Sequence, residues 1–335
     1  ISACLVGSEM CIRDSNQGLA LPLAIEAGVT VRARVVDGRE VEAVALDLDE
    51  VDRFPVGEPG RGEGWRAFVR GAVGELQRAG VSLPGAHLEF SGTVPRGSGL
   101  SSSAALEVAL VLALLGLAGE PEPPRIELAQ LCSRIENDWV GAQTGMLDQL
   151  AALCGQTGHA LRIDFRTLEV RPVPLDLEGH RLVTLDSGEQ HANAQGGYNR
   201  RRAECARACE LLGVESLREA VPEMARDLPD PLDRRVAHVL GAEERVDEAV
   251  RALAERDLPR LGKLIDQEHA SLRDLYEVST NAVEETVQSL REAGAIGARI
   301  VGGGFGGHVL GLLPPDATPP SGAVEVTPGP GARLL

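Results

Sequence analysis

The sequence predicts an α+β fold of about two domains, in which strands and helices come in separate blocks. Strand-like segments, some of them with a period of two, are concentrated between Leu19 and Val94. Long segments with helical spacing of their apolar residues dominate the chain after Ser187. The length of 335 residues is enough to bury a sizeable core. We therefore expect one domain at residues 16–187 and a second at residues 188–335.

In the N-terminal half, strand-like and helix-like patterns succeed one another. Strands are expected at residues 19–27, 29–36, 41–48, 87–94, 160–165, 169–173 and 181–186. Helices are expected at residues 65–79, 101–117, 126–139 and 146–154. The segment at 50–64 is rich in proline, glycine and acidic residues, so we expect a loop there.

The C-terminal half is mostly helical and closes with short strands. Helices are expected at residues 198–212, 233–254, 258–275 and 281–293. Strands are expected at residues 298–301, 308–313 and 323–326.

Charge and composition exclude several classes of function. With 33 basic and 50 acidic residues, the net charge of −17 should repel nucleic acid and anionic lipid. The only lysine, Lys263, does not stand in a P-loop motif. The six cysteines form no CxxC pair, which fits a reducing cytoplasm. The longest apolar run, residues 108–118, is too short for a membrane span, and no secretory signal is apparent, so we expect a cytoplasmic protein.

Residues 1–15 do not resemble the rest of the chain. They follow neither the helical nor the strand period, yet they hold two of the six cysteines, Cys4 and Cys11. The stretch CLVGSEMCIRDS also resembles a translated sequencing-adapter fragment. We therefore exclude residues 1–15 from the fold prediction as a non-native segment, and expect that a native segment preceded Asn16. A genuine variable N-terminus is the alternative.

The sharpest local motif is PRGSGLSSSA, in which a strand leads through glycines into an apolar helix. Gly97 and Gly99 would let the backbone approach a ligand closely, and a helix N-terminus offers free N–H groups to an anion. Ser101, Ser102 and Ser103 could donate to phosphate oxygens or bind Mg²⁺. An ordinary serine cap on the helix is the alternative. Three serines after two glycines favour a phosphate site.

Two further segments could line a cleft with this motif. VGGGFGG, at residues 301–307, indicates a close approach to a ligand or another backbone, or else a tight hairpin. ENDWVGAQTGMLDQ carries Glu136, Asp138 and Asp148 at the ends of two helices. A carboxylate at a helix C-terminus favours a compensating cation, and phosphoryl transfer uses a metal-bound carboxylate and a base. Solvated surface charge is the alternative, and the spacing does not decide between them.

The segment that follows Asp186 carries two further polar candidates. His191 and Tyr198 could contact a sugar or another polar substrate. The arginines after Tyr198 are expected to form a solvated helix face or ion pairs with neighbouring acids.

These motifs resemble those of a known family. PRGSGLSSSAALEVAL resembles the second motif of the GHMP small-molecule kinases, and the resemblance extends from Asn16 to the end of the chain. Further stretches resemble, in the right order, the galactokinase branch of that family: NQGLALPLAIEAG, WRAFVRG, ENDWVGAQTGMLDQ, HANAQGGYNRRRAEC, SLRDLYEVST and GARIVGGGFGGHVLGLLP. The resemblance implies the two-domain GHMP fold, with an N-terminal domain like one ribosomal-protein domain and a ferredoxin-like C-terminal domain.

The resemblance also implies how the chain would bind MgATP. The triphosphate and the adenine would contact Trp65, Phe68, Gly97, Gly99, Ser101, Ser102 and Ser103. One of the last two serines, together with Glu136, would hold Mg²⁺. The family usually has tyrosine where Phe68 stands.

For the sugar, the resemblance implies a base and two contacts. Asp148 would accept the proton of the anomeric hydroxyl, while Tyr198 and the backbone of Gly145 would contact the ring. Residues 303–307 would pack behind the base. The implied reaction is ATP-dependent phosphorylation of D-galactose, with no obligate protein partner.

Two alternatives remain open at this point. One is a GHMP kinase for another sugar, such as arabinose or a uronic acid, and the other is a non-catalytic sensor of sugar and ATP. The intact serine triplet favours an enzyme. The family's phosphoryl-supporting arginine and its Glu-His-x-Asp sugar clamp precede NQG, and residues 1–15 hold neither. We therefore expect the chain as written to bind nucleotide with little or no kinase activity.

Overall fold

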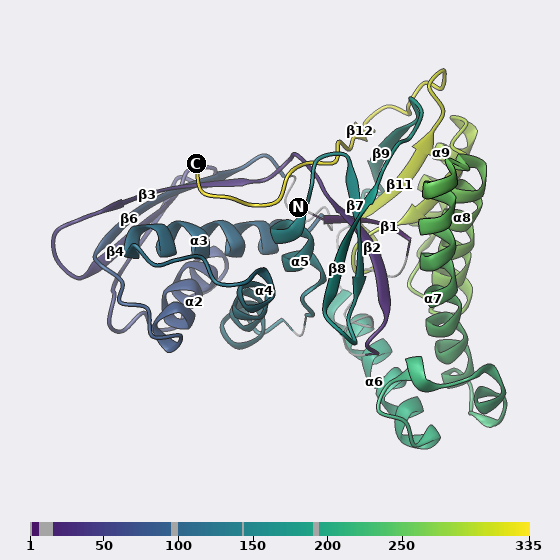
Figure 1. Cartoon of the computed structure of the whole chain (residues 1–335), viewed down its shortest axis with the longest axis horizontal. Helices are drawn as coiled ribbons and strands as arrows, with labels where there is room; N and C mark the ends of the chain where they lie inside the picture. The colour runs from purple at the N-terminus through teal and green to yellow at the C-terminus, as the bar shows by residue number, and fades with distance from the viewer. Residues whose placement is uncertain (1, 7–15, 95–99, 143, 190–193) are drawn as a thin grey trace.

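The computed structural model describes residues 2–6, 16–94, 100–142, 144–189 and 194–335, and of residues 2–6, 194, 195 and 198 the backbone alone. Within these ranges the chain forms three four-stranded sheets that follow one another along the long axis of the molecule (Figure 1). Most of the helices lie beside the two outer sheets. The α+β class is confirmed. No helix in these ranges is both long and apolar enough to cross a lipid bilayer.

The outer sheet of the N-terminal domain has the strand order β3-β6-β4-β5. Its strands are β3 (Val29–Val35), β4 (Glu40–Ala45), β5 (Glu50–Pro55) and β6 (Ala86–Gly92). The helices beside it are α2 (Trp65–Arg78), α3 (Ser102–Ala118), α4 (Arg125–Arg134) and α5 (Leu147–Cys154). α3 contacts β3 on one side and α2, α4 and α5 on the others. This is why its sequence is apolar almost all round.

The other two sheets are entirely antiparallel. The middle sheet has the order β1-β2-β7-β8, with strands Ser2–Val6, Leu19–Ala24, His159–Asp164 and Glu169–Pro174. The C-terminal sheet has the order β10-β11-β9-β12, with strands Gly297–Ile300, His308–Leu313, Arg181–Asp186 and Val324–Glu325. Its helices are α6 (Ala194–Leu212), α7 (Leu232–Glu255), α8 (Leu258–Asp274) and α9 (Asn281–Glu292), with short 3₁₀ turns at Leu217–Glu219 and Pro222–Asp227.

The two halves of the chain share one hydrophobic core. Leu21 and Leu23 of β2 pack in the same buried cluster as Val246 of α7, Leu261 of α8 and Leu310 of β11. Burial of apolar surface between the halves stabilises their relative position, because separating them would return these side chains to water.

Two strands lie where the sequence predicts none. β5 occupies part of the predicted loop. The prediction missed this strand because Val51 faces solvent, whereas Asp52 is buried and receives two hydrogen bonds of 2.8 Å from Arg70. β1, in the segment excluded from the fold prediction, pairs with β2. Strand pairing at a sheet edge depends on backbone groups, so it does not require the side-chain period that the prediction used.

The pairing of β9 favours a domain boundary earlier in the chain than the predicted one. The boundary predicted near Ser187 assigns β9 to the N-terminal domain, but β9 pairs with β11 and β12 of the C-terminal sheet. Strand pairing therefore favours a division before Arg181, and the boundary at Ser187 stays a prediction.

An arginine network holds α6 against the rest of the C-terminal domain. Its members are Arg201, Glu204, Arg234, Arg235 and Glu277. The side chain of Arg235 is 1% exposed and donates to Glu204 at 2.7 Å and to Glu277 at 2.6 Å. Arg201 donates to the backbone carbonyl of Tyr276. The network therefore ties α6 to α7 and to the segment after α8.

The end of the chain returns to the N-terminal domain (Figure 1). The backbone N–H of Gly331 donates to the carbonyl of Gly155 at 2.7 Å, and that of Ala332 donates to Ala152 at 2.7 Å. Residues 331–332 therefore satisfy carbonyl groups at the C-terminal end of α5, which a helix by itself leaves without partners.

Candidate active site

The N-terminus of α3 has the local geometry of an anion site. Ser101 precedes the helix with a φ of 56°, so the chain turns sharply before the first helical residue. The side chain of Ser101 makes no capping hydrogen bond within the described residues, which disfavours the alternative of an ordinary serine cap. Ser102 and Ser103 form the first turn and are half-buried. Gly97 and Gly99 of the same motif lie outside the described residues.

Glu136 lies opposite this turn and accepts three hydrogen bonds. Ser103 Oγ donates to its Oε1 at 2.8 Å, while Thr144 Oγ1 and Gln149 Nε2 donate to its Oε2 at 2.5 and 3.0 Å. The side chain is 8% exposed. The carboxylate is therefore held in one orientation by partners from α3, from the loop before α5 and from α5 itself.

A π-helical turn places Glu136 in this position. The helix predicted at 126–139 is present, but its type changes within that range: α4 ends at Arg134 and the π-helix Ile135–Val140 continues it. The wider turn brings Trp139 against α2, where a Cβ on Gly74 would meet the indole ring at 2.2 Å. Trp139 Nε1 also donates to the buried Glu75 at 3.0 Å. Single π-turns of this kind occur often at functional sites.

Glu107 and Gln149 complete what we call the acidic cluster, defined as Glu107, Glu136, Asp148 and Gln149. Gln149 Nε2 donates to Glu107 Oε2 at 3.1 Å, and both side chains are 0% exposed. Burial, together with the neighbouring charges of Glu136 and Asp148, raises the pKa of Glu107 well above its ordinary value, although the hydrogen bond from Gln149 acts in the opposite direction. Glu107 therefore favours its protonated form.

Asp148 lies in the first turn of α5 and is half-buried. The N-terminal end of a helix favours an ionised carboxylate. Gly145 lies two residues before α5. The residue before it, Thr144, is held in place by Asn137, which donates to the carbonyl of Thr144 at 3.1 Å. Asp138, the third carboxylate of this segment, is exposed and lies 3.6 Å from Arg78, so the surface interpretation holds for it.

The structure does not bring every predicted site residue into this cluster. Trp65 contacts Phe90 edge to face and donates to Glu50 at 2.8 Å, and neither partner belongs to the cluster. Phe68 is half-buried against the same core. Tyr198 lies on α6 with only its backbone described, and His191 lies outside the described residues. The roles implied for Trp65, Phe68 and Tyr198 stay predictions.

The glycine-rich segment at 301–307 is the hairpin between β10 and β11, and it also makes close approaches. A Cβ on Gly304 would meet Val278 at 2.6 Å, and one on Gly306 would meet the carbonyl of Glu189 at 2.6 Å. Both interpretations of its glycines therefore hold. The contacts given for the segment lie near the start of α6, and its packing behind Asp148 stays a prediction.

Three residues of the site were not singled out in the sequence: Glu107, Thr144 and Gln149. Glu107 could have been suspected, because an acid inside an apolar helical run is rarely buried without a reason. Thr144 and Gln149 carried no signal of their own, since threonine and glutamine are common on surfaces. Within the described residues, no three His, Cys, Asp or Glu side chains gather where they could hold a metal ion by themselves.

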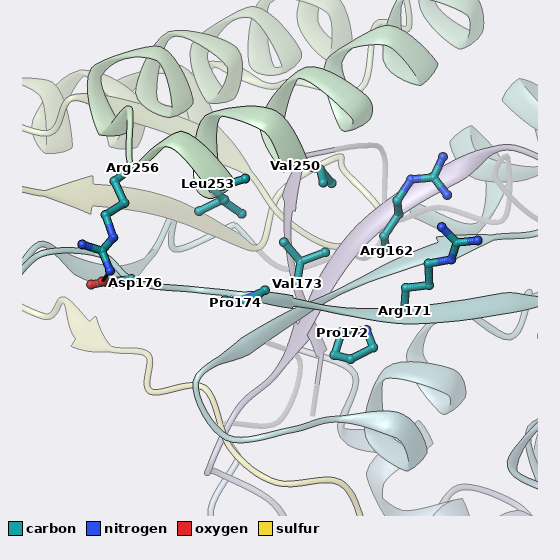
Figure 2. Close-up of a pocket in the computed structure, with 10 residues that line it drawn as sticks. Arg162, Arg171, Pro172, Val173, Pro174, Asp176, Val250, Leu253 and Arg256 are labelled. Carbon is teal, nitrogen blue, oxygen red and sulfur yellow. Dashed lines mark ion pairs between the residues drawn. The ribbon is translucent and has the colours of Figure 1, made fainter.

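A separate cavity of about 640 Å³ lies between β7, β8 and α7 (Figure 2). Its arginines each have an acidic partner: Arg162 with Asp247, Arg171 with Glu169 and Arg256 with Asp176. It shares no lining residue with the acidic cluster. Its positive charges are balanced, so it is a weaker candidate for binding phosphate than the N-terminus of α3.

Comparisons with known proteins give matches in both halves of the chain. The model of the GHMP kinases N terminal domain matches residues 67–156, and that of the GHMP kinases C terminal domain matches residues 249–326. The chain is 41% identical to a galactokinase of Mycobacterium tuberculosis over 310 residues, which cover 90% of this chain and 85% of that protein. It is 39% identical to a galactokinase of Streptomyces coelicolor over 317 residues, covering 90% of this chain and 80% of that protein.

Solved structures give the same result. The Lactococcus lactis galactokinase in complex with galactose superposes with a TM-score of 0.91 at 28% identity, covering all of this chain and 93% of that one. A mevalonate kinase of Methanococcus jannaschii, at 17% identity, shares the fold with a TM-score of 0.70. With motifs, geometry and relatives in agreement, the chain belongs to the galactokinase family of the GHMP kinases.

Proposed function

We propose that this protein transfers the γ-phosphoryl group of ATP to the anomeric hydroxyl of D-galactose, giving galactose 1-phosphate and ADP. As a member of its family, the chain is a sugar kinase that phosphorylates an alcohol group. The observation that carries the proposal is the meeting of Ser103, Glu136 and the helix of Asp148 beside the N-terminus of α3. The proposal places the enzyme in the cytoplasm, where free thiols such as Cys132 stay reduced.

The triphosphate would bind at the N-terminus of α3. Free N–H groups of the first turn and the positive end of the helix dipole favour phosphate oxygens. The hydroxyls of Ser101 and Ser102 would add further donors, and Gly97 and Gly99 would complete the loop. Trp65 and Phe68 would flank the adenine, as the resemblance implies.

Ser103 and Glu136 fit a magnesium ion shared with the phosphates. Two oxygens bound side by side to Mg²⁺ lie about 2.9 Å apart, because each is about 2.0–2.1 Å from the ion in an octahedron. Ser103 Oγ and Glu136 Oε1 lie 2.8 Å apart. Phosphate oxygens and water would supply the other ligands, and Ser102 is the alternative hydroxyl. When bound, Mg²⁺ neutralises charge that develops on the transferred group.

Asp148 would act as the base. Its carboxylate would accept the proton of the anomeric hydroxyl while the hydroxyl oxygen attacks the γ-phosphorus and ADP leaves. Tyr198 and the backbone of Gly145 would hold the sugar ring so that the oxygen lies in line with the leaving group.

The test is product formation with a choice of sugars. It uses the restored chain, which we define as this chain with the family's Gly-Arg…Gly-Glu-His-x-Asp-Tyr segment, arginine included, placed ahead of Asn16, beside the chain as written. We expect ADP release that depends on galactose, and a sugar 1-phosphate identified by phosphorus NMR. Faster turnover of arabinose or a uronic acid would favour a kinase for another sugar. Tight binding of ATP and galactose to the restored chain without turnover would favour a sensor and overturn the proposal.

A further inference from the structure

The amide of Gln149 connects the three elements that carry the proposed chemistry. Its Nε2 donates to Glu136 Oε2 at 3.0 Å and to Glu107 Oε2 at 3.1 Å. Glu107 lies on α3, Glu136 on the π-helical turn and Gln149 on α5. One side chain that is 0% exposed therefore links the helix of Ser103, the carboxylate of Glu136 and the helix of Asp148.

The two oxygens of Glu136 have different partners. Oε2 accepts from Thr144 and Gln149, both of which lie in or just before α5, whereas Oε1 faces Ser103. A carboxylate held at one oxygen by two donors cannot rotate freely about its terminal bond. Its other oxygen therefore stays directed toward Ser103 and the N-terminus of α3.

Stability alone does not explain why this side chain is polar. Glu107 Oε1 and Gln149 Oε1 are buried and receive no hydrogen bond from the described residues. A buried acceptor without a donor loses its hydrogen bonds to water on folding, and apolar side chains of similar shape would avoid that cost. The polar pair is therefore better explained by what it does for Glu136 than by its contribution to the core.

We propose that Gln149 is a positioning residue for the cation: it orients Glu136 Oε1 toward the bound metal, and Glu107 holds its amide in place. The inference rests on the proposed function, because it concerns the magnesium ion proposed there. Residues that orient a metal ligand typically change metal affinity or activity by about 10–100-fold when they are replaced.

The test measures how strongly Mg²⁺ promotes ADP binding, by calorimetry with Mg²⁺ and with EDTA, on the chain as it stands. In Gln149→Leu, the factor by which Mg²⁺ raises the affinity for ADP should be about tenfold smaller than in the unmodified chain. This lies within the range for residues that orient a metal ligand. ADP affinity in EDTA should not change, because Gln149 does not face the nucleotide. Ala152→Gly is the matched control, since it weakens the same helix without removing these hydrogen bonds and should keep the gain.

Two further variants keep the test decisive. Glu107→Gln retains an acceptor for the amide and should keep the Mg²⁺-dependent gain, whereas Glu107→Leu should reduce it. If Gln149→Leu does not fold, Gln149→Asn is the substitute. Its shorter side chain stays polar but should no longer bring the amide to Glu136, so it should show the same loss. An unchanged gain in folded Gln149 variants overturns the inference alone. The absence of any gain in the unmodified chain overturns the proposed magnesium site and the inference with it.

Discussion

Two clusters of charged side chains, one in each domain, are built on opposite principles. In the arginine network of the C-terminal domain, Arg235 is paired with Glu204 and Glu277, so positive and negative groups balance each other. In the acidic cluster of the N-terminal domain, the partners given for Glu107 and Glu136 within the described residues are neutral hydroxyl and amide groups.

The difference separates a structural cluster from a functional one. A balanced network satisfies its own charges and needs nothing from solution. Acids that lie close together with neutral partners repel one another when more than one is ionised, and a bound cation would offset that repulsion. We therefore expect the Mg²⁺ proposed above to stabilise the acidic cluster, whereas the arginine network would stabilise the fold in every state.

The largest expected effect tests whether the acidic cluster is catalytic. Asp148→Asn in the restored chain should lower kcat by roughly 10²–10⁴-fold, since asparagine keeps the size of the side chain but cannot accept the proton. ATP affinity and Tm should barely change. The measurement is kcat, ATP affinity and Tm on the one variant. A loss below about tenfold with folding intact would exclude Asp148 as the base.

The second prediction tests whether the arginine network is structural. Arg235→Met should destabilise the fold by about 1–3 kcal/mol, because the buried guanidinium would no longer donate charged hydrogen bonds to Glu204 and Glu277. The kcat per folded molecule should stay close to that of the parent. Denaturant unfolding measures the first quantity and a stopped assay at low temperature the second. Arg207→Met, which removes an exposed ion pair with Glu210, is the control and should be nearly neutral.

The third prediction concerns the phosphate side of the acidic cluster. Replacing Ser102 and Ser103 together by alanine in the restored chain should weaken MgATP binding by about tenfold or more, since each hydroxyl would donate to a charged group. The chemical step should also slow. Calorimetry and single-turnover kinetics report the two effects, with Ser289→Ala on α9 as the control. Unchanged affinity and rate would contradict a phosphate site at this helix.

The smallest expected effects are opposite responses to pH. Hydrogen bonds from Arg235 and Arg234 lower the pKa of Glu277 to about 2, from an ordinary value of 4.5. Its contribution to stability is therefore complete above pH 4.5 and is lost as the pH falls toward about 2. For Glu107, whose pKa is raised, the folded state must hold a proton, so stability falls as the pH rises above 4.5.

The two glutamine variants make that comparison measurable. Tm of the parent minus that of Glu277→Gln should increase with pH up to 4.5 and then level off. Tm of Glu107→Gln minus that of the parent should begin to increase only above that pH. Thermal unfolding followed by circular dichroism across the acid and neutral range gives both curves. Parallel curves would show that the two clusters do not differ in how they carry charge.

The sequence predicts those parts of the site that depend on local chemistry. Glycines and serines around the start of α3, and acids at the ends of neighbouring helices, carry their signal within a few residues. The bridge from Glu107 through Gln149 to Glu136 could not be predicted, because it joins residues up to 42 positions apart and needs the helices already packed. β5 was missed because a buried ion pair, Asp52 with Arg70, replaces the apolar side chain that the strand period expects.

The hydrogen bonds from Gly331 and Ala332 to the end of α5 have a consequence for biosynthesis. The helix that carries Asp148 and Gln149 leaves the ribosome about 180 residues before the segment that completes its last turn. At about 5–20 residues per second, roughly ten to forty seconds pass between the two events. During that interval the N-terminal domain can collapse around α3, but the carbonyl groups of Ala152 and Gly155 do not yet have their partners from residues 331–332. α5 is therefore among the last parts of the enzyme to reach its final form.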